Sequence, residues 1–197
     1  MIEPPACDVL ARLEARDAYE RESGVARSKR LRQITPEVGR FLHTLVLATK
    51  PRVILEIGTS GGYSTIWLAA AARVISGHVT TLEIDPAKAG LAEENLRGAG
   101  LTGAVSVRLG DAFAYLRDLD TRVDFAFLDA EKEDYLGFYE LIVPLMNPGA
   151  VLVADNLISH ELDLAEFRER ALTDERLSAV IVPIGRGELL AVRVPGR

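Results

Sequence analysis

The feature that most constrains this fold is an alternation of short β-branched runs with longer helical stretches. Five apolar runs are predicted to be strands, at residues 53–57, 79–84, 105–109, 125–128 and 150–154. Several are almost continuously apolar, which is typical of strands covered by helices on both faces. Helical segments are predicted between them, at residues 63–75, 86–98, 111–119 and 135–146. This repetition predicts a parallel α/β sheet with right-handed crossovers.

The two ends of the chain depart from this alternation. Helices are predicted before the first strand and after the fifth, at residues 8–22, 36–49 and 164–172, and Thr35 is placed to cap the second of them. The sequence Asn-Pro-Gly at 147–149 is predicted to break the chain before the fifth strand. Two further apolar runs, at 179–184 and 189–194, surround a Gly-Arg-Gly turn and predict a hairpin. We therefore expect a mostly parallel seven-stranded sheet with helices on both faces and a C-terminal antiparallel hairpin.

Composition limits the classes of protein that this chain can belong to. A hydrophobic content of 48% excludes wholesale disorder, and a net charge of −6 gives no general electrostatic case for nucleic-acid binding. The single cysteine, Cys7, excludes an internal disulfide and a multi-cysteine zinc site. The longest apolar run, 66–72, is far shorter than the roughly 20 residues that cross a bilayer. We expect one domain over 1–197 in the cytoplasm, with no secretory signal and no membrane partner.

A glycine-rich loop, Gly58-Thr59-Ser60-Gly61-Gly62, follows the first predicted strand. Ligands of open α/β sheets bind outside the carboxyl ends of the strands, and glycine permits close approach of backbone to ligand. The loop departs from the dinucleotide pattern Gly-x-Gly-x-x-Gly at its second glycine. Glu56, just before the loop, would repel a pyrophosphate and attract the ammonium group of an amino-acid-bearing cofactor.

Two more positions are predicted to contact such a cofactor. Glu83, near the end of the second strand, is placed to accept hydrogen bonds from both ribose hydroxyls. The segment Gly110-Asp111-Ala112, after the third strand, is placed to lie against an adenine.

Acidic and amide side chains also follow two later strands. Asp129 ends the strand at 125–128, and Asp155-Asn156 ends the strand at 150–154. If these strands are neighbours, the three side chains converge, and such oxygen ligands suit Mg²⁺ rather than Zn²⁺. Taken singly, an Asp-Asn pair is often a turn or cap, and Asp129 with Lys132 is often only a solvated ion pair. Their combination beside the glycine loop favours a metal site.

With these blocks in order, the sequence resembles the class I S-adenosylmethionine-dependent methyltransferases, and within them the metal-dependent O-methyltransferases of the catechol and caffeoyl-CoA type. The matching stretches are VILEIGTSGGYST, GHVTTLEIDP, RLGDAFAYL, VDFAFLDAEKEDY and GAVLVADN. The resemblance implies a Rossmann-like fold with N-terminal helices over 1–50, a cofactor- and metal-binding core over 51–156, and a C-terminal helix and hairpin over 157–197.

The resemblance also implies roles for individual residues. S-adenosylmethionine would be bound by Ile34, Glu56, Gly58, Thr59, Ser60, Ser64, Glu83, Ile84, Asp111, Ala112 and Asp129. Mg²⁺, or another divalent cation, would be held by Asp129, Asp155 and Asn156, and Lys132 matches the general base. The implied reaction is methyl transfer to a hydroxyl of a phenolic or vicinal-dihydroxy small molecule, and similar proteins are commonly homodimers.

The acceptor is the least specified part of this interpretation. The segment after Asn156 is short, and Glu131, Arg30 and Arg32 stand where catechol-type enzymes carry aromatic side chains, which permits a more polar, anionic or larger acceptor. A tRNA hydroxyuridine acceptor is an alternative that rests on the basic stretch from Arg27 through Lys29 to Arg32. A nicotinamide-dependent oxidoreductase and a non-catalytic binding protein are further alternatives. The altered glycine pattern disfavours the first, and the intact Asp129, Lys132, Asp155 and Asn156 disfavour the second.

Overall fold

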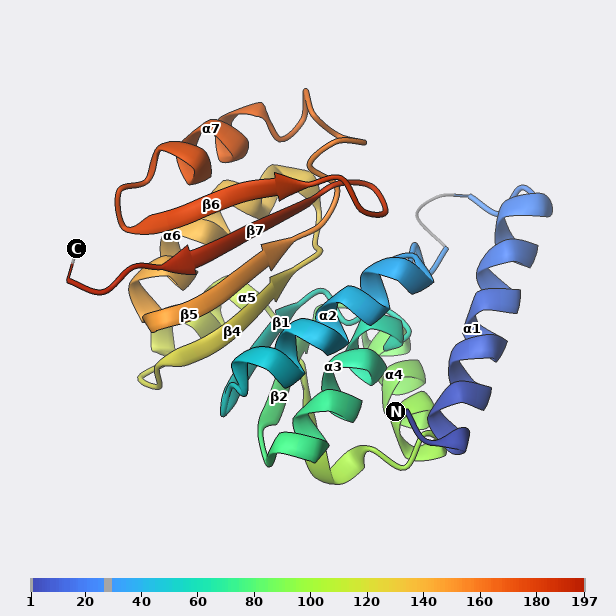
Figure 1. The fold of residues 1–197 in the computed structure, drawn as a ribbon. Helices are drawn as coiled ribbons and strands as arrows, with labels where there is room; N and C mark the ends of the chain where they lie inside the picture. The colour runs from blue at the N-terminus through green and yellow to red at the C-terminus, as the bar shows by residue number, and fades with distance from the viewer. Residues whose placement is uncertain (1, 27–29, 197) are drawn as a thin grey trace.

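The structure is a computed structural model that describes residues 2–26 and 30–196, and a seven-stranded sheet forms its centre (Figure 1). The strands are β1 (Val53–Ile57), β2 (His78–Glu83), β3 (Val105–Leu109), β4 (Val123–Leu128), β5 (Met146–Ala154), β6 (Leu177–Val182) and β7 (Glu188–Arg193). Their order is β3-β2-β1-β4-β5-β7-β6. The first five are parallel, and β7 is antiparallel to both of its neighbours. The predicted mixed sheet with a C-terminal hairpin is therefore confirmed.

Helices cover both faces of this sheet (Figure 1). On one face lie α1 (Pro4–Glu22), α2 (Pro36–Thr49), α3 (Tyr63–Ile75) and α4 (Pro86–Gly98). On the other lie α5 (Ala112–Asp118), α6 (Tyr135–Leu145) and α7 (Ala165–Thr173). Because successive strand residues point to opposite faces, Ile54 of β1 enters the first hydrophobic core while Leu55 and Ile57 enter the second. This double burial explains the nearly continuous apolar runs in the sequence.

Two of the element boundaries that differ from the sequence prediction have a reason in the backbone. Helix α1 begins at Pro4 instead of residue 8, because proline is well tolerated in the first helical turn. Strand β6 covers Leu177–Val182 instead of 179–184, because Pro183 has no N–H group to donate to the strand ladder. Thr35 caps α2 as predicted, accepting a hydrogen bond from the Val38 amide at 3.4 Å.

The predicted break at 147–149 is wrong, since these residues lie inside β5, which begins at Met146. The chain accommodates them through a shift in register: Val123 of β4 pairs with Met146, but Phe125 pairs with Val151. The Asn147 amide group donates to Asp124 Oδ1 at 2.7 Å across this irregularity. The Asn-Pro-Gly signal therefore marks a bulge and not the end of pairing.

The strand order reverses between β1 and β4, which both lie in the middle of the sheet. Loops that leave the carboxyl ends of these two strands separate at that point and leave room for a ligand. In the described parts of the chain, no helix combines the length and the apolar character needed to cross a bilayer.

Candidate active site

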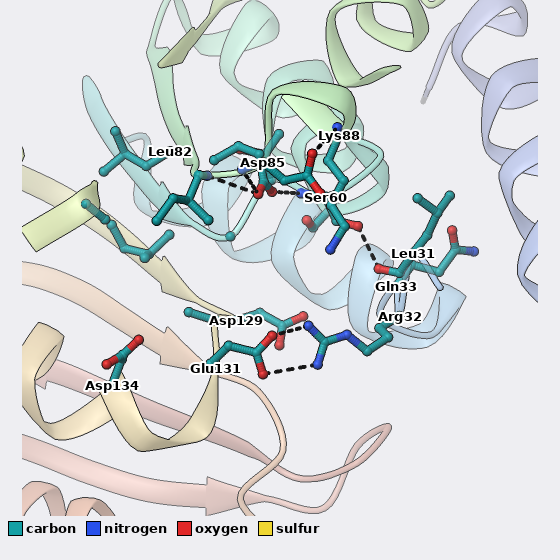
Figure 2. A pocket seen from close by; sticks show the side chains of 18 of the residues that line it. Leu31, Arg32, Gln33, Ser60, Leu82, Asp85, Lys88, Asp129, Glu131 and Asp134 are labelled. Atoms are coloured by element: carbon teal, nitrogen blue, oxygen red, sulfur yellow. Dashed lines mark hydrogen bonds and ion pairs between the residues drawn. The ribbon is translucent and has the colours of Figure 1, made fainter. Parts of the chain in front are cut away.

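A cavity of about 350 Å³ opens at the carboxyl ends of the central strands, where the strand order reverses (Figure 2). Most residues predicted from the sequence to bind cofactor or metal line it: Ile34, Gly58, Thr59, Ser60, Ser64, Glu83, Ile84, Asp111, Ala112, Asp129, Lys132 and Asn156. Glu56 and Asp155 are not among the lining residues and are buried. The fold thus brings together, at one cavity, side chains from positions 34 to 156.

The glycine loop between β1 and α3 forms one wall of this cavity. Gly58 has a φ of +98°, and a Cβ built on it would lie 2.1 Å from the backbone oxygen of Asp129. The loop is held from both sides, because the Ser60 amide donates to Glu83 Oε2 at 2.7 Å and the Ser60 hydroxyl donates to the Leu31 carbonyl at 2.6 Å. Glycine at position 58 therefore lets β1 and β4 bring their loops into direct contact.

Glu83 organises the neighbouring loop after β2. Its Oε1 accepts hydrogen bonds from the amides of Ile84 and Asp85 at 3.0 and 2.9 Å, while Oε2 accepts the bond from Ser60. A carboxylate has about four acceptor positions, so Glu83 retains capacity for a ligand hydroxyl on the cavity side. The amide of Gly110 in turn donates to the Glu83 carbonyl at 2.8 Å, which ties the loop after β3 to the same point.

Glu56 is a fully buried acid behind the glycine loop. The Thr65 hydroxyl donates to its Oε2 at 2.6 Å, and its Oε1 has no hydrogen-bond partner among the described residues. Burial raises the pKa of Glu56 to about 7, against the opposing effect of the hydroxyl groups of Ser64, Thr65 and Thr81. The free oxygen is a place where a cationic group would be stabilised.

Lys132 belongs to a short 3₁₀ turn, Lys132–Asp134, that follows β4. Its Nζ donates to Asp129 Oδ1 at 3.3 Å, to the Ala130 carbonyl at 3.0 Å and to the Tyr135 hydroxyl at 2.8 Å. Tyr135 is fully buried, and its hydroxyl also contacts the backbone oxygens of Leu128 and Asp155 at 3.3 and 3.2 Å. Tyr135 thereby fixes the Lys132 amine relative to the ends of both β4 and β5.

Asp129, Asp155 and Asn156 meet at the adjoining ends of β4 and β5. The Asn156 side-chain amide donates to Asp129 Oδ1 at 3.2 Å, and the Asn156 backbone amide donates to Asp155 Oδ1 at 2.6 Å. Asn156 has a φ of +77°, a conformation that asparagine tolerates better than most residues. Burial and the nearby Asp129 charge raise the pKa of Asp155. The predicted convergence of these three side chains is present in the structure.

A further acid, Glu188 at the start of β7, lies against this group and was not anticipated from the sequence. It is fully buried beside Asp155, and burial together with the Asp155 charge raises its pKa. The sequence gives only a weak signal, a charged residue in an otherwise apolar run. Tyr135 was also missed, because a tyrosine at the start of a helix is usually read as a packing residue.

The open side of the cavity is lined by charged groups. Arg32 and Glu131 form a bidentate ion pair that joins the segment before α2 to the loop after β4 (Figure 2). Arg32 Nη1 donates to Glu131 Oε2 at 3.2 Å, and Nη2 donates to Oε1. Arg186, in the β6–β7 turn, lines the same cavity, and the described residues provide its guanidinium with no hydrogen-bond or ion-pair partner. Of the basic stretch considered for tRNA, Arg27 and Lys29 lie outside the described residues, and Arg32 is engaged with Glu131.

The donor set decides what kind of ion these groups could hold. Across residues 2–26 and 30–196, no three His, Cys, Asp or Glu side chains are arranged as a metal-binding group. A cation held here would therefore use the two aspartates together with the amide oxygen of Asn156. Such an all-oxygen set fits Mg²⁺, which keeps several waters, and does not fit the nitrogen and sulfur preference of Zn²⁺.

The fold, the cavity at the strand-order reversal and the acids at the carboxyl ends of β1 and β2 together define a Rossmann-like methyltransferase architecture. The model of the O-methyltransferase family matches residues 18–194, which is most of the chain. The chain belongs to the O-methyltransferase family.

Individual relatives agree with this assignment. The catechol O-methyltransferase of Niastella koreensis is 40% identical over 129 residues, which are 64% of this chain and 58% of the relative. That of Mycobacterium tuberculosis is 41% identical over 134 residues, 68% of this chain and 60% of the relative. The match thus spans 58–60% of the length of these curated relatives. The O-methyltransferase of Bacillus cereus, solved in complex with SAH, is 30% identical with a TM-score of 0.79, over 94% of this chain and 90% of that one.

Proposed function

We propose that this protein transfers a methyl group from S-adenosylmethionine to a hydroxyl of a phenolic or vicinal-dihydroxy small molecule, with Mg²⁺ as a required cation. One observation carries the proposal. Asp129 Oδ1 accepts hydrogen bonds from both Lys132 and Asn156 at the wall of the cavity that also contains Glu83 and the Gly58 loop. A base, a cation-binding group and a cofactor cleft would then share one space of about 350 Å³.

The choice of S-adenosylmethionine is supported by the acids around the glycine loop. Glu56 lies behind the loop with one oxygen that has no partner among the described residues and could meet a cationic group, while Glu83 has acceptor capacity for ribose hydroxyls. The Bacillus cereus relative, similar over nearly its whole length, binds SAH, the product form of this cofactor.

Replacing Glu83 with alanine should weaken SAH binding by about 10- to 100-fold, the usual contribution of a hydrogen bond to a charged group. The variant loses the bonds to Ser60, Ile84 and Asp85 as well as the predicted ribose contacts. Isothermal titration calorimetry with SAH measures the change, with NAD⁺ as a second ligand that we expect not to bind. Glu94→Gln, an exposed position on α4, is the control. Equal affinity of wild type and Glu83→Ala would contradict this role.

In the proposed reaction the residues of this chain orient the acceptor and receive its proton. Acting as the neutral amine, Lys132 takes the hydroxyl proton on Nζ, and the acceptor oxygen forms a bond to the methyl carbon as the carbon–sulfur bond of the sulfonium breaks. Tyr135 and Asp129 hold Lys132 beside the cavity. Mg²⁺, when bound by Asp129, Asp155 and Asn156, would stabilise the negative charge of the acceptor oxygen. Alignment of donor and acceptor supplies much of the remaining acceleration, because the sulfonium is already reactive.

Removal of divalent cations tests the proposal directly. Methyl transfer from labelled S-adenosylmethionine to catechol should disappear in EDTA and return when Mg²⁺ is added in excess. Activity that survives exhaustive chelation would contradict the cation requirement, and absence of transfer to any dihydroxyphenol in the presence of Mg²⁺ would contradict the acceptor class.

The charge on the open side of the cavity favours an acceptor that carries an anionic group. Because Arg186 has no partner among the described residues, Arg186→Met should raise the KM for 3,4-dihydroxybenzoate by about 10-fold and leave the KM for catechol nearly unchanged. Steady-state kinetics with the two acceptors gives the comparison, and Arg97→Met, at an exposed position on α4, is the matched control. An equal change in KM for both acceptors would show that Arg186 does not bind the anionic group.

A further inference from the structure

Glu188 is a buried acid for which the described protein provides no hydrogen-bond donor. Its relative exposure is 0%, and both carboxyl oxygens lack a hydrogen-bond partner among the described residues. A buried polar group without a hydrogen-bond partner is costly, so an acid at such a position calls for an explanation.

The strand register places Glu188 opposite one of the predicted metal ligands. Strands β5 and β7 are antiparallel, and their last pair toward the cavity is Ala154 with Leu189. One step further along the same register would set Asp155 opposite Glu188. Beyond that step, the Leu157 amide donates to the Gly187 carbonyl at 2.8 Å, offset by one residue from the register. Directly opposite side chains of an antiparallel pair lie on the same face. This register explains why the two carboxyls are close.

The turn before Glu188 holds it at this position. The Arg186 carbonyl accepts hydrogen bonds from the amides of Ile158 and Ser159, both at 3.0 Å. Gly187 has a φ of +90°, and a Cβ there would lie 2.4 Å from Ile158. The β6–β7 turn is thus fastened to the segment after Asn156, and Glu188 cannot move away from Asp155 without breaking this contact.

The charges around Glu188 are unbalanced. Asp155 and Asp129 repel it, and Lys132, already bonded to Asp129, attracts it. Three carboxyl groups therefore lie near one ammonium group in a buried space. Like charges that face each other across a strand pair destabilise the fold, and a cation bound beside Asp155 would relieve that repulsion.

We propose that Glu188 is a positioning residue of the cation site. It holds the Asp155 carboxyl group in place and strengthens divalent-cation binding. The inference rests on the proposed function, because it assumes that Asp129, Asp155 and Asn156 bind the cation. Glu188 is not among the direct ligands, since the described residues contain no set of three acids arranged for one ion. Groups that support metal ligands in this way commonly change metal affinity by 10- to 100-fold when they are removed.

The proposal predicts that replacing Glu188 lowers the affinity for the cation and raises the stability of the cation-free protein. Glu188→Gln keeps the shape and removes the charge, and Glu188→Leu removes both the charge and the polar group. Both should raise the Kd for Mn²⁺ by about 10-fold or more, with the larger effect for leucine. Both should also raise the cation-free Tm by about 2–4 °C, because a buried unpaired acid has been removed. A residue with only a structural role would lower the Tm and leave the Kd unchanged.

Mn²⁺ binding is measured by electron paramagnetic resonance of the free ion, and Tm by calorimetry in EDTA, on the whole chain. Glu94→Gln on α4 is the control acid and should change neither quantity. Wild-type protein that binds no Mn²⁺ would overturn the proposed cation site itself. If wild-type protein binds Mn²⁺ and both Glu188 variants bind it with a Kd within about twofold of wild type, only the role of Glu188 is overturned. Normal Mn²⁺ affinity in Glu188→Gln with weak affinity in Glu188→Leu would overturn the contribution of charge.

Discussion

Asp129→Ala is expected to lower kcat/KM for methyl transfer by about 10³-fold, within the range that placement of an acid–base group contributes. Asp129 connects Lys132, the proposed base, to Asn156 of the proposed cation site. Its Oδ1 accepts bonds from Lys132 at 3.3 Å and from Asn156 at 3.2 Å, so alanine releases both groups at once. It also removes one of the two carboxylates proposed to bind Mg²⁺. Asn at this position keeps an oxygen ligand without the charge and should lose less activity.

The same substitution should not unfold the protein. Asp129 lies near Asp155 and Glu188, and removing its charge relieves repulsion among buried acids. We therefore expect a Tm equal to or above that of wild type, measured by calorimetry beside the kinetics. Asp118→Ala, at an exposed acid on α5, is the matched control and should retain full activity. Activity of Asp129→Ala within tenfold of wild type would show that Asp129 holds neither the base nor the cation.

The central part of the fold is predictable because its signals are redundant. Each of β1 to β4 is rich in β-branched or aromatic residues and is followed within two residues by a glycine or aspartate. Helix α4 has a clear start at Asp85, which accepts bonds from the amides of Ala87 and Lys88. Local preference and burial indicate the same element there. The positions of candidate ligands after β4 and β5 follow directly, because parallel strands end at one edge of the sheet.

The bulge in β5 was not predictable by the same reasoning. Local turn preference at 147–149 is strong, but the partner strand β4 continues past this point and keeps β5 paired beyond it. Tertiary pairing therefore overrides a local breaker signal, as it does in many sheet edges and bulges.

Glu188 and Tyr135 were missed because their links to Asp155 arise from contacts between segments far apart in the sequence. Glu188 comes 33 residues after Asp155 in the sequence, and nothing near it in the chain indicates a partner. The antiparallel register of β5 and β7 brings them together. Tyr135 is similar, because its hydroxyl reaches the backbone of Asp155, 20 residues away. Pairings of this kind depend on strand order, which short motifs do not encode.

Among the described glycines, Gly58 is the one where replacement by alanine is expected to have the largest effect. The φ of +98° is strained for alanine, and the new Cβ would lie 2.1 Å from the Asp129 carbonyl oxygen, a rigid backbone atom. Strain of this type costs about 1–3 kcal/mol. Relief of the clash requires the β1 loop and the β4 loop to separate, which moves Asp129 and Lys132 away from the cofactor side of the cavity.

We therefore expect the Tm of Gly58→Ala to fall by about 5–10 °C and kcat/KM to fall by about 10²-fold, since small displacements of reacting groups cost that much. Gly90→Ala on α4 is the matched control, because the same methyl group there meets no atom within 4 Å. That variant should gain about 0.5–1 kcal/mol of stability, as alanine favours a helix, and keep full activity. Calorimetry and methyl-transfer kinetics on both variants compare one added carbon at two glycines. If Gly58→Ala behaved like Gly90→Ala, direct contact between the β1 and β4 loops would not be needed to place Asp129 and Lys132.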